Sequence, residues 1–70
     1  MPTFKSAEEV KEYVREFGLP APRVRSIKSR RTQLTRFYAD CDNMPRESAR
    51  GLAAALEGSN VSIFQRGAVV

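Results

Sequence analysis

"RVRSIKSRRTQLTRFY", residues 23–38, carries six basic side chains and no acidic one. Two β-like runs, 23–28 and 33–41, lie on either side of the segment SRRT. The second run is rich in Thr, Phe and Tyr, which favour a pleated, half-buried surface. We therefore expect a β-hairpin around Arg30 and Arg31. A tight two-residue turn usually contains Gly or Asn, so a four-residue loop with the same pairing is an open alternative.

The pairing of this hairpin determines which side chains share a face of the sheet. If Ser29 lies opposite Thr32, Arg25 lies opposite Arg36, and alternate pairs point to opposite faces. Unpaired guanidinium groups are too costly to bury, so the arginine-bearing face is expected to be open to solvent. The residues expected on the core face are Val24, Ser26, Thr35, Phe37, Ala39 and Cys41.

The clearest helix signal lies before the hairpin, in SAEEVKEYVREFGLP at residues 6–20. Ser6 and Glu9 have the spacing of a capping box, in which each side chain accepts a backbone N–H at the start of a helix. Gly18, followed by Leu and Pro, is typical of a helix end. The apolar face of this helix is predicted to hold Val10, Tyr13, Val14 and Phe17.

A second helix is expected after the hairpin, within residues 42–58. Asp42 or Asn43 is the expected N-cap, Pro45 suits the first turn, and Gly58 suits the end. The alanine-rich stripe of this helix favours close packing against a sheet. Its members are Ala49, Leu52, Ala53 and Leu56.

These elements follow one another in the order α-β-β-α-β, where the last strand is NVSIFQR at residues 60–66. They predict the α+β fold class, with a three-stranded, mostly antiparallel sheet and two helices packed on one face. Residues 1–70 are expected to form a single small α+β domain, near the lower size limit for one core. In the last strand, Val61 and Ile63 are expected to face the core, and Phe64 and Arg66 the opposite side.

Composition argues against several classes of function. The chain has no His and one Cys, so we expect no disulfide, no metal site and no cofactor. Cys41 lies on the predicted core face without a histidine base, and no glycine-rich phosphate loop is present, so we expect no catalytic residue and no enzyme. The acidic residues Asp40 and Asp42 resemble the start of a calcium loop, but the later ligand positions do not fit, and capping of the second helix is favoured. We expect no membrane partner and a cytoplasmic protein, because signal-peptide and membrane-span patterns are absent.

The positive charge of the chain is local. Residues 23–36 contribute six positive charges to a net charge of +4, and the segments on either side contribute −1 each. Arginines beside aromatic rings are typical of surfaces that meet phosphates and stack bases. We therefore expect a non-catalytic basic module that binds nucleic acid, DNA or RNA, through an Arg/aromatic sheet face and a basic hairpin loop. The expected binding residues are Arg23, Arg25, Lys28, Arg30, Arg31, Arg36, Tyr38, Phe64 and Arg66.

The same face also fits a second class of function. Arg and Tyr dominate the energetics of protein interfaces, so the alternative is a small phage-type inhibitor or adaptor that docks on an acidic protein surface. Anti-CRISPR proteins are similar in size and composition, but no motif of such a family is present. A homodimer through strand 60–70 stays open, since this apolar edge is unpaired in the expected sheet. The plainest interpretation is a solvated basic face without a ligand.

Overall fold

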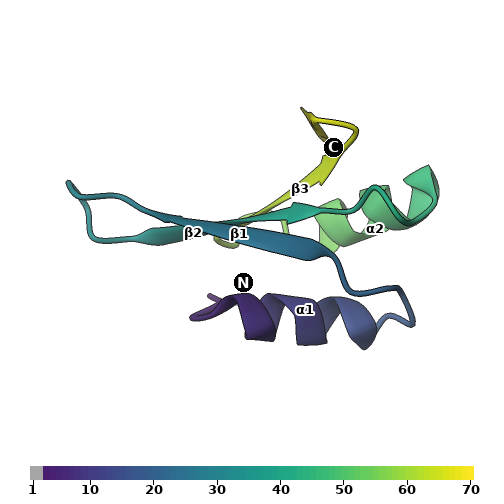
Figure 1. Ribbon diagram of the computed structural model, residues 1–70, viewed down its shortest axis with the longest axis horizontal. Helices are drawn as coiled ribbons and strands as arrows, with labels where there is room; N and C mark the ends of the chain where they lie inside the picture. The colour runs from purple at the N-terminus through teal and green to yellow at the C-terminus, as the bar shows by residue number, and fades with distance from the viewer. Residues whose placement is uncertain (1–2) are drawn as a thin grey trace.

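The chain folds as two helices and a four-stranded mixed sheet in the computed structural model, which describes residues 3–70. The sheet has the strand order β1-β2-β3-β4, and the helices cover one of its faces (Figure 1). The elements are α1 (Ala7–Arg15), β1 (Arg23–Lys28), β2 (Thr35–Asp40), α2 (Arg46–Ala55), β3 (Val61–Gln65) and β4 (Ala68–Val69).

The α+β class is confirmed, but the predicted three-stranded, mostly antiparallel sheet differs in detail. β1 pairs with β2, and β3 with β4, in antiparallel fashion, whereas β2 and β3 are parallel. The physical reason is the connection through α2, which carries the chain back along the sheet, so that β3 starts at the same end as β2. A strand–helix–strand unit of this kind gives a parallel pair.

The last residues form a fourth strand, which the predicted three-stranded sheet did not include. Arg66 and Gly67 adopt positive φ angles of 54° and 79°, which is the geometry of a tight two-residue hairpin turn. β4 then covers the free side of β3, and Val70 N–H extends the pairing by donating to Ile63 O at 2.9 Å. β3 is therefore paired with β2 on one side and β4 on the other, and β4 is the outer edge of this end of the sheet. The homodimer through strand 60–70 stays a prediction.

The role expected for Asp42 at the start of α2 is also corrected. Pro45 is the N-cap residue, and α2 begins without a side-chain capping bond. Asp42 Oδ1 instead accepts the backbone N–H of Arg66 at 2.6 Å, so this carboxylate holds the β3–β4 turn. The Gln65 side chain supports the same region by donating to the carbonyl oxygen of Met44 at 2.8 Å.

The hairpin of β1 and β2 forms as predicted, but its register differs by two residues. Arg25 lies opposite Tyr38, and Arg36 lies opposite Ile27. The predicted direct pairing of Arg25 with Arg36 is therefore wrong, and these arginines are diagonal neighbours. A shift by two residues keeps every side chain on its predicted face, because side chains alternate with a period of two.

The register is shifted because the loop is wider than a two-residue turn. Ser29 N–H donates to Leu34 O at 2.9 Å, which leaves four residues in the loop. Only Gln33 adopts a positive φ, of 63°. A tight turn would require positive φ at Arg30 or at both Arg30 and Arg31, which their side chains disfavour.

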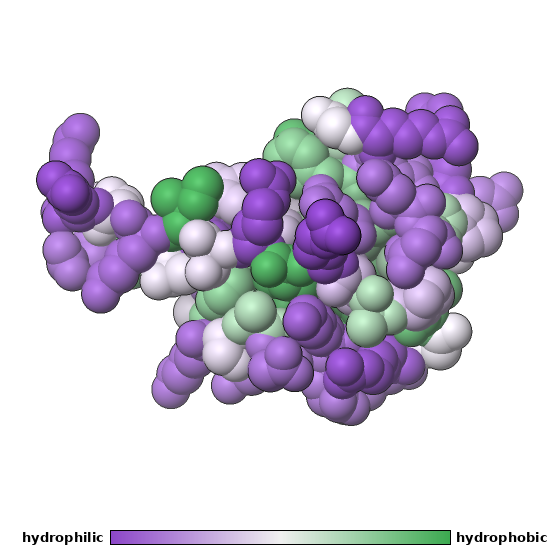
Figure 2. Space-filling model, viewed as in Figure 1, coloured by the Kyte–Doolittle hydropathy of each residue, from purple (hydrophilic) through white to green (hydrophobic). Residues whose placement is uncertain are grey.

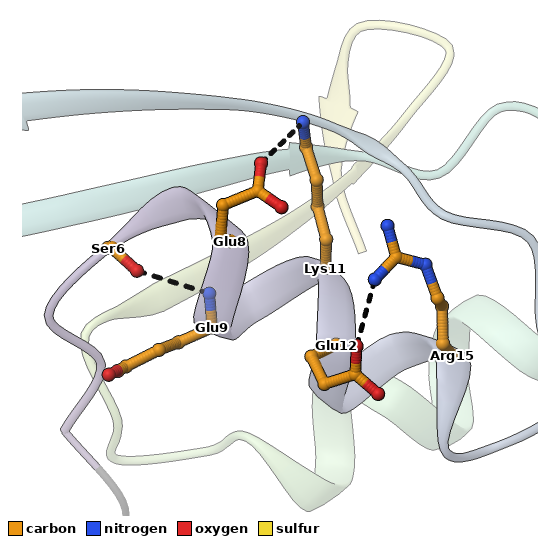
Figure 3. A network of polar contacts seen from close by, with 6 residues as sticks. All are labelled: Ser6, Glu8, Glu9, Lys11, Glu12 and Arg15. Atoms are coloured by element: carbon orange, nitrogen blue, oxygen red, sulfur yellow. Dashed lines mark hydrogen bonds and ion pairs between the residues drawn. The ribbon is translucent and has the colours of Figure 1, made fainter.

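The predicted start of α1 is confirmed. Ser6 Oγ accepts Glu9 N–H at 3.2 Å (Figure 3), and Glu9 Oε1 accepts Lys5 N–H at 2.8 Å. Both of these backbone N–H groups, which have no partner within the helix, are thus satisfied. The two ion pairs among residues 3–70 lie on this helix, and they are Glu8–Lys11 at 3.5 Å and Glu12–Arg15 at 2.9 Å.

The core lies between the helices and one face of the sheet. Phe37, Ala39 and Cys41, which were expected on the core face of the hairpin, are buried. Phe17, expected on the apolar face of the first helix, is 51% exposed, and Ser26, expected on the core face, is exposed. Ser26 lies opposite the buried Phe37 on the core face, but at the margin of the core where the arm begins. The buried apolar side chains are Phe4, Val10, Val14, Phe37, Ala39, Cys41, Met44, Ala49, Leu52, Leu56, Val61 and Ile63.

Candidate functional site

The sheet face that points away from the helices carries most of the predicted binding residues, and we call it the open face. Buried and outward-pointing side chains alternate along β2 and β3, as expected for a sheet with one covered face. The strand pairing therefore determines the members of the open face. They are Arg23, Arg25, Ile27, Arg36, Tyr38, Asp40, Ser62, Phe64 and Val69.

Three residues of the open face, Asp40, Ser62 and Val69, were missed in the sequence. Asp40 lies opposite Arg23 and brings a negative charge to one end of the face. Strand alternation from Tyr38 would have placed it there, because residues two apart share a face. Val69 lies opposite Phe64 and could not have been placed without knowing that the last residues form β4.

Arg36 is oriented by neutral acceptors on the neighbouring strand and loop. Its Nε donates to Ser62 Oγ at 3.0 Å, and its Nη1 donates to the carbonyl oxygen of Ser59 at 3.3 Å. Neither bond neutralises the positive charge. The guanidinium is thus held in place with further N–H groups free to meet an anion, since arginine has five donors.

Tyr38 and Phe64 lie side by side on the open face. Their ring centroids are 5.7 Å apart and the rings are inclined by 65°, which is an edge-to-face contact. Both side chains are half-buried, and they belong to the face opposite the core. The pair forms an apolar centre next to Arg36.

Lys28, Arg30 and Arg31 lie apart from this centre, on a projecting hairpin. Residues 25–34 are all exposed, and we call this segment the arm. It extends beyond the end of α1 (Figure 1), and in Figure 2 it forms a hydrophilic tip with hydrophobic atoms just behind it. The two large apolar side chains of the arm, Ile27 and Leu34, are 58% and 70% exposed.

The tip of the arm is held by its own hydrogen bonds. Gln33 N–H donates to Ser29 O at 2.8 Å, and the Gln33 side chain donates to Arg30 O at 2.9 Å. Thr32 N–H donates to Ser29 Oγ at 3.3 Å. These bonds organise the loop backbone and use neither of the two guanidinium groups of Arg30 and Arg31.

Arg66 is not part of the open face, in contrast to the prediction. It lies in the β3–β4 turn and lines a groove of about 510 Å³ between α2 and β4. Two further arginines, Arg46 and Arg50, line the same groove. Arg66 therefore belongs to a separate basic region on the helix side of the sheet edge.

None of the basic side chains of residues 23–36 takes part in an ion pair among residues 3–70, where both ion pairs lie on α1. Asp40 is the one acidic member of the open face, and it forms no ion pair with these basic side chains. The open face and the arm thus present positive charge to the solvent.

Chemical groups for catalysis or metal binding are sparse in the part of the chain that the structure describes. Burial and, to a smaller degree, the charges of Asp40 and Asp42 raise the pKa of the Cys41 thiol to about 11, which disfavours a nucleophilic thiolate. Within residues 3–70, no three side chains of the metal-ligating types lie together, and neither helix is long and apolar enough to cross a membrane.

Comparison with known proteins adds no relative. The chain matches no protein-family model, and neither a curated protein nor a solved structure is significantly similar to it.

Proposed function

We propose that this protein is a non-catalytic module that binds nucleic acid through the open face and the arm. The observation that carries the proposal is the unbroken positive charge of residues 23–36, displayed on an exposed hairpin that forms no ion pair with any residue of the described range 3–70. Phosphates are the ligands that such a surface favours, because each contact with Lys or Arg releases condensed counterions. The proposed setting is the cytoplasm, since the lone Cys41 is a reduced, buried thiol.

The open face adds a second kind of contact to the proposed surface. Arg36 has donors free beside the Tyr38–Phe64 pair, so a phosphate and an adjacent base or sugar have charged and apolar surface within reach of each other. This combination is used in single-stranded nucleic-acid binding, where rings stack on bases and guanidinium groups meet phosphates.

An acidic protein surface is the second candidate partner. Ile27 and Leu34 are large, apolar and exposed next to arginines, and protein interfaces also combine apolar and arginine contacts. In that case the protein would be an inhibitor or adaptor that uses the same arm. The two functions differ in whether an oligonucleotide alone is bound.

The test is fluorescence anisotropy with labelled single- and double-stranded oligonucleotides at about 50 and 200 mM salt. With four to six phosphate contacts, log K is expected to fall against log salt with a slope of roughly −3 to −5. Arg30→Ala with Arg31→Ala should weaken binding by roughly tenfold and reduce the slope by about 2.

The matched control is Arg46→Ala with Arg50→Ala, which removes the same charge from α2. This control is expected to weaken binding much less than the arm variant. Equal losses in both variants would mean that net charge, not the arm, determines binding. Flat titrations at both salt concentrations would contradict the proposal and leave the acidic protein partner as the better candidate.

A further inference from the structure

We infer that the arm enters the major groove of double-stranded DNA as a two-stranded β-ribbon. This inference rests on the proposed function and specifies the form of nucleic acid and the mode of contact. It starts from the projection of the arm, where Ile27, Lys28 and the loop that follows are exposed on both faces of the ribbon.

The dimensions of the arm suit the major groove. Neighbouring strands lie about 4.8 Å apart, and the major groove of B-DNA, about 12 Å wide, admits a two-stranded ribbon. β2 pairs with β3 from Phe37 onward, so the free ribbon starts at the pair Ile27–Arg36. From Ile27 to Ser29 it rises by roughly 7 Å before the four-residue loop, which is comparable to the groove depth of about 8.5 Å. The minor groove is only about 6 Å wide, and the major groove of an RNA duplex is too narrow for side chains to read.

The charges of the arm match the two walls of that groove. Arg25, and Arg36 at the base of the arm, belong to one face of the ribbon, while Lys28, opposite Thr35, belongs to the other face. A ribbon in the major groove has a phosphate backbone on each side. Cations on both faces therefore meet both strands, which a flat contact through one face would not require.

The tip and the apolar pair suit the floor of the groove. Arg30 and Arg31 lie in the organised loop, and arginine pairs with guanine O6 and N7 through two parallel hydrogen bonds. Ile27 in β1 and Leu34 at the end of the loop are 58% and 70% exposed, and apolar side chains contact the thymine methyl group in this groove. Major-groove contact would thus explain why two large apolar side chains are kept in solvent among arginines.

The first experiment compares nucleic-acid forms. Anisotropy is measured on a DNA duplex of about 20 base pairs, on the RNA duplex of the same sequence, and on each single strand. The DNA duplex is expected to bind at least roughly tenfold more tightly than the others. Equal binding of RNA or of single strands would overturn the inference and leave the proposed function standing. Binding to none of them would overturn both.

The second experiment identifies the groove by changing single base atoms throughout the duplex. Replacing guanine by 7-deazaguanine removes the N7 acceptor, and replacing thymine by uracil removes the methyl group, both in the major groove. Each replacement is expected to weaken binding by roughly three- to tenfold. Replacing guanine by inosine removes a minor-groove amino group and should change nothing. A loss with inosine alone, or no loss in any case, would overturn the inference.

A pair of variants connects these effects to the arm. Ile27→Ser with Leu34→Ser is expected to abolish the difference between thymine and uracil duplexes and to leave the salt slope unchanged, because no charge is removed. The matched control is Phe17→Ser, which also removes an exposed apolar side chain, 51% exposed, at the end of α1. The thymine effect should persist in the control. Its persistence in the arm variant would contradict the assigned contact.

Discussion

Arg36 is held on the open face by two hydrogen bonds, whereas an ordinary surface arginine is mobile. Hydrogen bonds to Ser62 Oγ at 3.0 Å and to Ser59 O at 3.3 Å orient its guanidinium without neutralising it. Such a group has lost part of its side-chain freedom before any ligand arrives, which lowers the entropic cost of binding. A planar fork held in this way differs from a mobile ammonium group.

Arg36→Lys should therefore weaken nucleic-acid binding by roughly tenfold even though the charge is kept. The measurement is anisotropy on the preferred oligonucleotide at one salt concentration. Arg23→Lys, on the same face, is the matched control and is expected to change the affinity less than about threefold. If the two variants behave alike, the orientation of Arg36 has no role in binding.

Cys41 provides a prediction for stability as a function of pH. Its thiol has a pKa raised from 9.0 to about 11 in the folded state, chiefly by burial. A raised pKa means that the neutral thiol stabilises the folded state below pH 9, and that this contribution is lost as the pH rises toward about 11. The loss should reach roughly 3 kcal/mol.

The check is urea unfolding of the natural chain and of Cys41→Ala at several values between pH 7.5 and about 10.5. At each pH, subtracting the free energy of unfolding of one protein from that of the other removes every pH-dependent contribution that both proteins share. The difference in the free energy of unfolding should be constant below pH 9 and should then shrink. A constant difference over the whole range would show that the thiol titrates normally.

Among the secondary-structure elements, the hairpins are determined by the residues in their turns. The β3–β4 turn has Arg66 at φ 54° followed by Gly67 at φ 79°, a turn in which Asn-Gly is the favoured pair. The β1–β2 loop avoids two positive φ angles by widening to four residues. Two registers that differ by two residues place the same side chains in the core, so the hydrophobic pattern does not distinguish them. The backbone angles that the turn residues can adopt determine which register forms.

Arg66→Asn should raise the free energy of unfolding by about 0.5–1 kcal/mol, because asparagine adopts a positive φ more readily than arginine. The Asp42 bond to the backbone N–H of residue 66 is kept. Chemical unfolding measures the change. The same variant tests the separation of Arg66 from the open face, since nucleic-acid affinity should change less than about threefold. A larger loss of affinity would include the α2–β4 groove in the binding surface.

For the whole molecule, stability rests on one small core. A domain of this size has a narrow margin of stability, so removal of a single buried side chain is a large fraction of the total. The N-terminal segment is tied to the sheet by Asn60, whose side chain accepts Phe4 N–H at 2.9 Å and donates to Phe4 O at 2.8 Å. The arm extends from this core without contributing to it.

Two leucines test whether the core, and not the arm, provides the stability of the fold. Leu52 in α2 is 1% exposed, and Leu52→Ala should cost about 2–5 kcal/mol of unfolding free energy. Leu34 on the arm is 70% exposed, and Leu34→Ala should cost less than about 0.5 kcal/mol. Urea unfolding followed by far-ultraviolet circular dichroism measures both. A comparable loss in Leu34→Ala would mean that the arm packs on the rest of the protein.

Features that depend on neighbours in the chain were predictable from the sequence alone. The capping box of Ser6 and Glu9, the α+β class and the separation of arginine and core faces in the first hairpin follow from local spacing and burial costs. Eight of the nine predicted binding residues lie on the open face or the arm for this reason. The periods of helix and strand are properties of the backbone itself, so they are visible in any sequence that obeys them.

Only the tertiary structure decided which segments meet. The parallel pairing of β2 with β3, the fourth strand, the bond from Asp42 to Arg66 and the projection of the arm join residues that are distant in sequence or depend on where the helices end. Several strand arrangements fit the same local sequence pattern. The free energies of loop closure and of core packing decide among them, and both depend on contacts throughout the folded chain. The amino-acid order therefore determined the faces and the charge of this protein, while packing determined the register, the strand neighbours and the shape of the surface that we propose binds DNA.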